Sequence, residues 1–204
     1  MKLMYFTGAA LLLSACGNEP VGVPSADAKA GNVVLVDDGT PVAAMVAPVA
    51  ADAIVQPTDA ATYQAMAGAA DKWESESSRV LLTKSTRPAV RSFAQMIINQ
   101  HGQASAKVKA AAAKAKAMVP TATLAVDQQG MLSEIRTAPA QDVDAVYLRH
   151  QRAVHARTLA LHQGFAANGD TPELQQVAAA LVPVFEQHIA ELDRVARSVP
   201  AVGG

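Results

Sequence analysis

Cysteine is almost absent from this chain of 204 residues, in which Cys16 is the only one. A single cysteine excludes an intramolecular disulfide and the thiolate clusters that hold structural zinc or iron–sulfur centres. The sequence also lacks a glycine-rich phosphate loop and a nucleophile elbow. Its formal net charge is −1, so nothing indicates a nucleic-acid-binding protein. The chemistry that remains open is that of histidine and carboxylate side chains.

The first fifteen residues have the pattern of an export signal. Lys2 precedes a mainly apolar run, residues 3–13, which is too short to cross a bilayer as a mature helix. The letters "LSAC" at 13–16 resemble a bacterial lipobox, in which cleavage leaves the cysteine first in the mature chain, carrying lipid. We therefore expect a signal peptide at 1–15 and lipidation of Cys16. The alternative is an ordinary secreted protein with a chance cysteine at its cleavage site.

The residue that follows the cysteine bears on where such a lipoprotein would be sorted. Gly17 stands there rather than aspartate, which resembles the default sorting to the outer membrane. We therefore expect a protein of the bacterial cell envelope that is held at the membrane by its lipid and faces the periplasm. The sequence identifies no protein partner.

Residues 16–57 differ in composition from the rest of the chain. They are rich in Ala, Val, Pro, Gly and Asp, and they contain no aromatic residue. This composition, without a sustained 3.6-residue period, is typical of a flexible linker. We expect a disordered tether at 16–57, one folded domain at 58–199, and a disordered tail at 200–204.

The folded part is rich in Ala, Leu, Gln and Lys, which favour helix, so the predicted class is all-α. Proline and glycine mark the expected ends: Pro88 suits a first helical turn, Gly169 a left-handed cap, and Thr171 an N-cap. Residues 119–140 are expected to form a connection with one short amphipathic piece. Two tight hairpins on either side of it predict an up-down-up-down four-helix bundle. The four helices are expected at 58–85 with Thr58 as N-cap, 88–117, 142–167 and 172–198.

The last of these helices contains Pro183. A proline inside a helix removes one amide hydrogen bond and pushes away the carbonyl four residues earlier, here that of Ala179. We expect a kink at Pro183, about one turn before His188.

One polar residue interrupts the apolar stripe of each predicted helix. His101, for example, shares its stripe with Phe93, Ile97 and Ala104, whereas Glu76 points away from the stripe of its helix and should be solvated. A rise of about 1.5 Å per residue places the four at similar depths below the tight turns, roughly 18–25 Å. The sequence therefore predicts one shared layer that contains Glu74, His101, His155 and His188.

Three segments of the folded part carry a family resemblance: "ADKWESESSRVLLTKSTRPAVRSFAQMIINQH", "DAVYLRHQRAVHARTLALHQGFA" and "GDTPELQQVAAALVPVFEQHIAEL". Over about residues 58–197 they resemble the DUF4142 family of bacterial envelope proteins. The resemblance implies a ferritin-like bundle without an established activity. It matches the four layer residues to recurring polar positions of the family and Pro183 to the proline of its last helix. His150 and His162 do not match its pattern well.

The residue spacing does not fit a ferritin-type di-iron site. Such sites need Glu-x-x-His on two helices, but Ile98 and Phe185 stand three residues before His101 and His188. One Glu and three His could still hold a single divalent metal, with zinc, iron, manganese and copper not separable from the ligand types. A metal-free polar layer that satisfies its own hydrogen bonds is the preferred interpretation, with the metal site and the absence of a shared layer as its alternatives.

Three functions are consistent with these features. The first is a non-enzymatic envelope lipoprotein, a binding, structural or stress protein at the periplasmic face. The second is a mononuclear metal-binding protein that uses the Glu74, His101, His155 and His188 layer. The third, an enzyme that uses such a metal, finds least support because the sequence lacks the motifs it would need.

Overall fold

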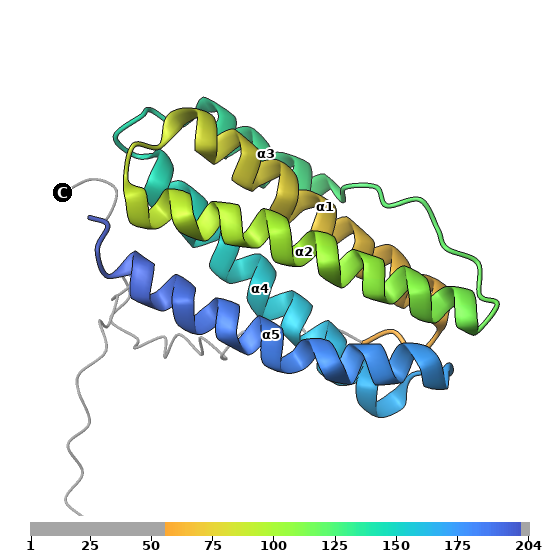
Figure 1. Cartoon of the computed structure of the whole chain (residues 1–204). Helices are drawn as coiled ribbons and strands as arrows, with labels where there is room; N and C mark the ends of the chain where they lie inside the picture. Colours follow the sequence, from red (N-terminus) through yellow and green to blue (C-terminus); the bar gives the residue numbers. More distant parts are fainter. Residues whose placement is uncertain (1–55, 201–204) are drawn as a thin grey trace, which may run out of the picture. The chain divides into compact units, whose positions relative to one another are not determined.

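The computed structural model describes residues 56–200 and consists there of five helices without a strand (Figure 1). The all-α class is thus confirmed, whereas a four-helix bundle is not, because five helices are present. The predicted signal peptide, Cys16, nearly all of the predicted tether and residues 201–204 of the predicted tail lie outside the described residues. The helices are α1 (Ala60–Lys84), α2 (Pro88–Lys114), α3 (Val126–Thr137), α4 (Val143–Asn168) and α5 (Pro172–Ala196).

The helix ends lie close to the predicted positions, with local corrections. Asp59, not Thr58, caps α1, because its carboxylate accepts the backbone N–H of Thr62 at 2.8 Å. Helix α2 ends three residues before the predicted Ala117, and Lys116 follows with a left-handed φ of 54°.

The turn between α4 and α5 uses its glycine in a way that the sequence did not indicate. Gly169 has φ −65° and ψ 151°, so the prediction of a left-handed cap was wrong. A Cβ added to Gly169 would lie 2.6 Å from the ring of Phe165, so glycine is required here by close packing. Thr171 is the N-cap as predicted, but its hydroxyl donates to Asp170 instead of capping the helix.

The topology differs from the predicted up-down-up-down order. Arg87, in the turn after α1, pairs with Asp144 at the start of α4, with 3.2 Å between Nε and Oδ2. At the opposite end, Asp170 in the turn after α4 donates its N–H to the carbonyl of Thr58 before α1. The two tight turns therefore lie at opposite ends, and the four long helices run up, down, down and up.

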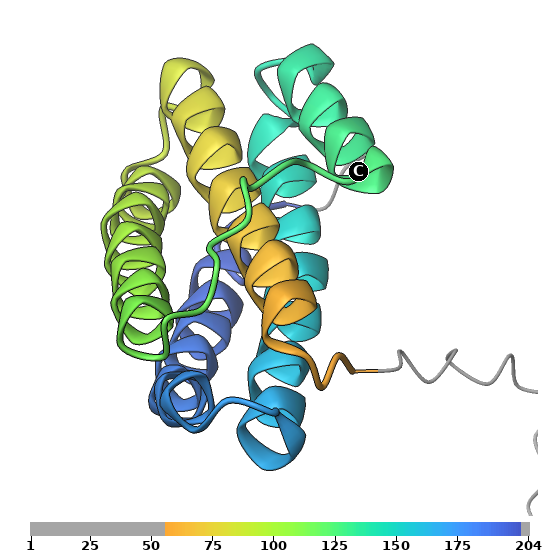
Figure 2. The same cartoon turned by 90° about the vertical axis from the view of Figure 1, so that its right-hand side faces the viewer.

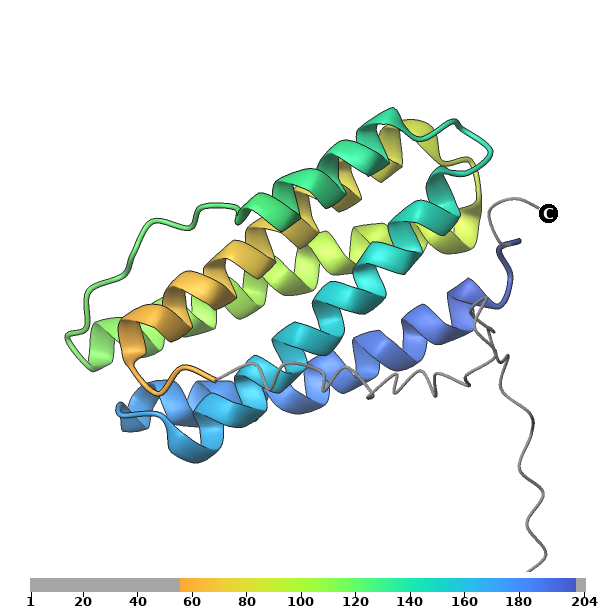
Figure 3. The same ribbon diagram turned by 180° about the vertical axis from the view of Figure 1, so that it is seen from behind.

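The topology differs from the predicted one because of the connection between α2 and α4. Residues 115–125 run back along the outside of the molecule, and α3 then continues beside α1 in the same direction (Figure 3). Together they return the chain to the end from which α2 started, so α4 runs parallel to α2. Helix α3 packs on α1 and α4, away from α2 and α5 (Figure 2).

The core consists of two apolar clusters along the helix axes. One contains Leu81, Phe93, Tyr147 and Leu192, and the other contains Tyr63, Ala104, Phe165 and Leu181. Along each long helix the predicted polar residue stands between members of the two clusters. The fold thus holds its polar side chains at mid-height of the core.

Two further features of the described helices bear on the sequence predictions. Pro183 lies inside α5, which continues as one helix across it, and the predicted kink stays a prediction. Of the helices between residues 56 and 200, none combines the length and the apolar character that crossing a membrane requires.

Candidate metal centre

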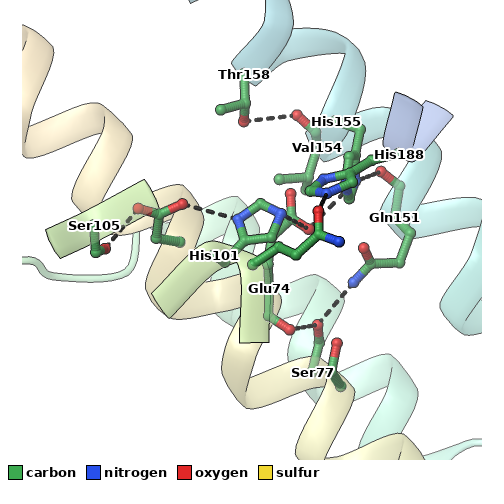
Figure 4. A network of polar contacts seen from close by, with 12 residues as sticks. Glu74, Ser77, His101, Ser105, Gln151, Val154, His155, Thr158 and His188 are labelled. Carbon is green, nitrogen blue, oxygen red and sulfur yellow. Dashed lines mark hydrogen bonds and ion pairs between the residues drawn. The ribbon is translucent and has the colours of Figure 1, made fainter. Parts of the chain in front are cut away.

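The four residues predicted to share a layer lie together in the core (Figure 4). Glu74 comes from α1, His101 from α2, His155 from α4 and His188 from α5, and none is more than 2% exposed. One ring nitrogen from each histidine lies within 4.8 Å of one from each of the other two. Three buried histidines this close together could hold a metal ion.

Glu74 lies against two of the histidines. Its Oε2 is 3.3 Å from Nε2 of His101 and 3.3 Å from Nδ1 of His155. These distances are within ion-pair range, but neither carboxylate oxygen has a hydrogen-bond partner. Because buried polar atoms are nearly always bonded, two free oxygens on one carboxylate are unusual.

His101 is oriented from the side opposite Glu74. Its Nδ1 lies 2.8 Å from Oδ1 of Asp71, whose Oδ2 accepts the hydroxyl of Ser105 at 2.6 Å. A carboxylate can only accept, so Nδ1 carries the proton that it donates to Asp71. Nε2 of the neutral ring is then the nitrogen with a free lone pair, and it has no hydrogen-bond partner.

The rings of His155 and His188 are also held at one nitrogen and have a free lone pair on the other. Nδ1 of His155 donates to the carbonyl of Gln151 at 3.0 Å, and Nε2 of His188 donates to the side-chain oxygen of Gln100 at 2.6 Å. Both partners are acceptors, which leaves a lone pair on Nε2 of His155 and on Nδ1 of His188. Neither atom has a hydrogen-bond partner.

Burial and mutual charge set the protonation of the layer. Burial raises the pKa of Glu74 to about 8, and the nearby charge of His101 lowers this pKa by a smaller amount. Burial by itself would lower the pKa of His101, but the carboxylates of Glu74 and Asp71 raise it above its ordinary value. Without a metal, Glu74 and His101 therefore hold a proton between them near neutral pH.

The two remaining histidines are neutral at the same pH. Burial lowers the pKa of His155 well below its ordinary value, and the charges of His101 and His188 lower it further. Burial also lowers the pKa of His188 to about 4. Neutral imidazole is the form that binds metals, so both rings are ready as ligands.

The geometry fits a single ion better than a pair. The three histidines can each offer one ring nitrogen, and the carboxylate of Glu74 lies beside two of them. Each imidazole is held by an acceptor at one nitrogen, as is usual for metal-bound histidine. Nitrogens around a tetrahedral zinc ion would be about 3.3 Å apart, so binding would draw the three rings together. Two ions would need bridging carboxylates, and Glu74 is the carboxylate in contact with these rings.

Three other residues that the sequence analysis singled out lie outside the layer. His150 is buried near the protein surface, where its Nε2 lies 2.9 Å from Glu134. His162 is in the core, but its Nδ1 is paired with the hydroxyl of Tyr63 at 3.1 Å. Glu76 is half-buried rather than fully solvated, and it lines a cavity between α1, α2 and the connection that follows α2.

Sequence reasoning missed the residues that orient the rings. Asp71 stands three residues before Glu74, one helical turn along the same face, so the spacing could have revealed it. Gln100 carried no such signal, because it follows no pattern with His188 in the sequence, whereas the bond of His155 to the Gln151 carbonyl lies within α4. The role of Gln100 depends on α2 and α5 lying side by side.

Comparison with known proteins agrees with the resemblance found in the sequence. No curated protein matches the chain. The crystal structure of a DUF305 fragment from Deinococcus radiodurans has the same helical fold, with a TM-score of 0.59 and 14% sequence identity. The match covers 67% of this chain and 94% of that one. The family described as "Domain of unknown function (DUF4142)" matches residues 44–195. This protein is therefore a member of the DUF4142 family.

Proposed function

We propose that this protein binds one divalent transition-metal ion between Glu74, His101, His155 and His188. The observation that carries the proposal is that three buried histidines lie together, one ring nitrogen of each within 4.8 Å of those of the other two, and that each ring has a nitrogen without a hydrogen-bond partner. Leaving such atoms unpaired costs about 1–3 kcal/mol for each group. A single cation would bind the three histidines and attract the carboxylate of Glu74, which lies against two of them.

The donor types narrow the choice of metal. Imidazole suits zinc, copper and iron, whereas magnesium and calcium prefer sites made of oxygen ligands alone. Manganese is compatible with the carboxylate but gains less from three imidazoles. We therefore expect zinc, copper or iron to bind more tightly than manganese, and magnesium or calcium to bind weakly.

The helix arrangement supports the same proposal. We infer a ferritin-like fold, because the four long helices run up, down, down and up with one long crossover, which is the connectivity of ferritin-like bundles. Such bundles build their metal sites from side chains on facing helices, and here each long helix supplies one candidate ligand.

We further propose that the domain works at the bacterial cell envelope as a lipoprotein without enzymatic activity. The sequence pattern before Cys16 supports a lipid anchor, and the composition of residues 17–55 supports a spacer between that anchor and the domain. Binding or buffering a metal at the periplasmic face of the outer membrane would then be the role of the domain.

The test is thermal unfolding of protein purified without a histidine tag, first stripped with a chelator and then titrated with zinc. A metal that binds only the folded state stabilises it by about 2.7 kcal/mol at one hundred times its dissociation constant, so the melting temperature should rise. His188→Ala and the more conservative His188→Gln should abolish most of the rise. His150→Ala should keep it, because His150 lies outside the layer.

Two outcomes would overturn the proposal. If zinc, copper and iron leave the melting temperature unchanged and elemental analysis of the untagged protein finds no metal, the layer is a metal-free polar network. If the metal effect survives in both His188 variants, the ion binds elsewhere.

A further inference from the structure

A cavity of about 480 Å³ lies between α1, α2 and the connection that follows α2. Its walls are mostly small or polar, and the connection is fastened over it by two bonds: Gln64 donates to the carbonyl of Met118 at 3.2 Å, and Lys72 donates to that of Ala122 at 3.4 Å. The lining residues that matter below are Asp71, His101, Gly102, Ser105 and Lys109.

The ring of His101 separates this cavity from the proposed metal centre. One edge of the imidazole contacts Asp71, which lines the cavity, and the other edge lies 3.3 Å from Glu74 inside the layer. In Figure 4 Ser105 lies on one side of this ring, and Glu74, His155 and His188 lie beyond it. Movement of one side chain would therefore join the cavity to the layer.

We propose that this cavity is the route by which the metal ion reaches Glu74 and the three histidines, with Asp71 as the first carboxylate that it meets. The inference rests on the proposed metal binding and adds the path to it. Asp71 is 6% exposed and holds both His101 and Ser105. A cation that reaches Asp71 competes for the carboxylate that orients His101, which frees this ring to turn and admit the ion.

The charges around the cavity make the route testable. Lys72, Arg79 and Lys109 line it and are exposed, against the acidic Asp71 and Glu76. Cationic groups at an opening slow the approach of a free cation, and salt screens this effect. Lys109→Glu should therefore speed zinc uptake by about threefold at low ionic strength and have little effect in high salt.

Gly102 offers a direct way to obstruct the cavity. It lines the cavity, and a Cβ added to it would meet no atom within 4 Å, so a side chain starts there in open space. Gly130 in α3 is the matched control, because its Cβ would also meet nothing within 4 Å and it does not line the cavity. Both substitutions replace a helical glycine, so their effects on helix propensity are equal.

The experiment is stopped-flow uptake of free Zn²⁺ by the metal-free protein, followed by its release to an excess of chelator. Gly102→Leu should slow both uptake and release by about tenfold and leave the dissociation constant unchanged, because an obstructed path slows both directions equally. Gly130→Leu should leave both rates unchanged. A change in the dissociation constant of Gly102→Leu would indicate damage to the site and would count against the route.

Failure of this inference and failure of the proposed function give different results. If the unaltered protein binds no zinc, the metal centre itself is wrong. If zinc binds but Gly102→Leu and Lys109→Glu leave its rates unchanged, or Gly130→Leu slows them equally, the centre stands and the ion reaches it elsewhere.

Discussion

At the scale of single residues, Asp71 has the largest indirect role in the proposed centre. Its carboxylate fixes the protonated nitrogen of His101 and makes the free nitrogen more basic. Asp71→Asn should weaken zinc binding about 10–100-fold, the usual cost of losing such a partner. Competition with a chromophoric chelator measures the affinity.

The matched control is Glu76→Gln, which removes a carboxylate from the same helix and the same cavity without touching His101. It should leave the equilibrium affinity within about twofold of the unaltered protein. An Asp71→Asn variant that binds zinc as tightly as this control would mean that Asp71 does not support the ligand.

His162 makes the stability of the metal-free protein depend on acid. Burial lowers the pKa of its ring from 6.5 to about 4, so between these values the unfolded chain binds a proton that the folded protein refuses. The contribution of His162 to the free energy of unfolding is fully present above pH 6.5, and it is lost as the pH drops toward 4. For this residue we expect a loss of about 2 kcal/mol between pH 7 and pH 5.

Urea unfolding at the two pH values, with chelator present, measures this loss. His162→Leu should make the difference between pH 7 and pH 5 smaller. Thr158→Val, one turn earlier on α4, removes a buried hydrogen bond but no titrating group, so it should lower stability equally at both values. A pH difference that is the same in His162→Leu and the unaltered protein would contradict the assignment.

The layer residues could be predicted because each one interrupts an apolar stripe, a pattern that depends on one helix at a time. His101 and His188 illustrate this, since both lie on strongly apolar faces. The atom that holds the ring of His188 could not be predicted in the same way. The contact between Gln100 and His188 joins α2 to α5, and no local pattern specifies which helices become neighbours.

At the scale of the helices, Gly169 shows how a turn can depend on packing rather than on backbone freedom. Gly169→Ala would place its Cβ 2.6 Å from the Phe165 ring and 2.7 Å from its carbonyl oxygen. Because the backbone φ is ordinary, the whole cost is steric, and we expect about 1–3 kcal/mol of destabilisation. Denaturant unfolding of the variant measures it.

Gly130→Ala is the comparison in α3, where the added Cβ meets nothing. It should stabilise the protein by up to about 1 kcal/mol through helix propensity. If both alanine variants are stabilised alike, the close approach of Phe165 is relieved at no cost and the explanation for Gly169 is wrong.

The helix boundaries were predictable to within a few residues because proline, glycine and capping side chains act locally. The exceptions had a competing interaction: Asp59 replaced Thr58 as the cap of α1, and Lys116 adopted a left-handed conformation after α2 ended early. At the start of α1 the neighbouring Thr58 and Asp59 are both suitable caps, and Asp59 is the one whose side chain accepts the backbone N–H of Thr62.

At the scale of the whole molecule, similar depths along the helices predicted the layer correctly although the predicted topology was wrong. The turns at 85–87 and 169–171 lie at opposite ends, whereas the prediction placed them at the same end. It still worked because the candidate ligands stand near the middle of helices of 25–27 residues, where the distance to either end is similar. The direction of α4 depends on the path of residues 115–142, which has little pattern of its own.

The lipid anchor is a prediction about the intact protein. Cys16→Ala removes the thiol that would carry the lipid, so the variant should not be acylated and should not be processed by the lipoprotein signal peptidase. Metabolic labelling with a fatty acid and membrane fractionation measure both effects. Recovery of an acylated, membrane-bound protein from the variant would exclude this anchor.

The last prediction concerns where the folded domain begins. The family match starts at residue 44, twelve residues before the first described residue, Gln56. The buried apolar residues of the described part run from Tyr63 to Val195 and pack in two clusters with one another. A chain that begins at Gln56 keeps all of them, and it also keeps the contact of Gln56 with Gly164. We therefore expect it to unfold cooperatively within about 2 °C of a chain that begins at residue 44, which corresponds to less than about 1 kcal/mol.

A chain that begins at Gln64 loses the Asp59 cap and Tyr63, whose ring stacks on Phe165 at 4.0 Å, and should be destabilised by about 3–5 kcal/mol. Circular dichroism melts of the three chains make the comparison. If the chain from Gln56 melts as low as the chain from Gln64, residues 44–55 contribute to the stability of the domain and the predicted tether ends before them.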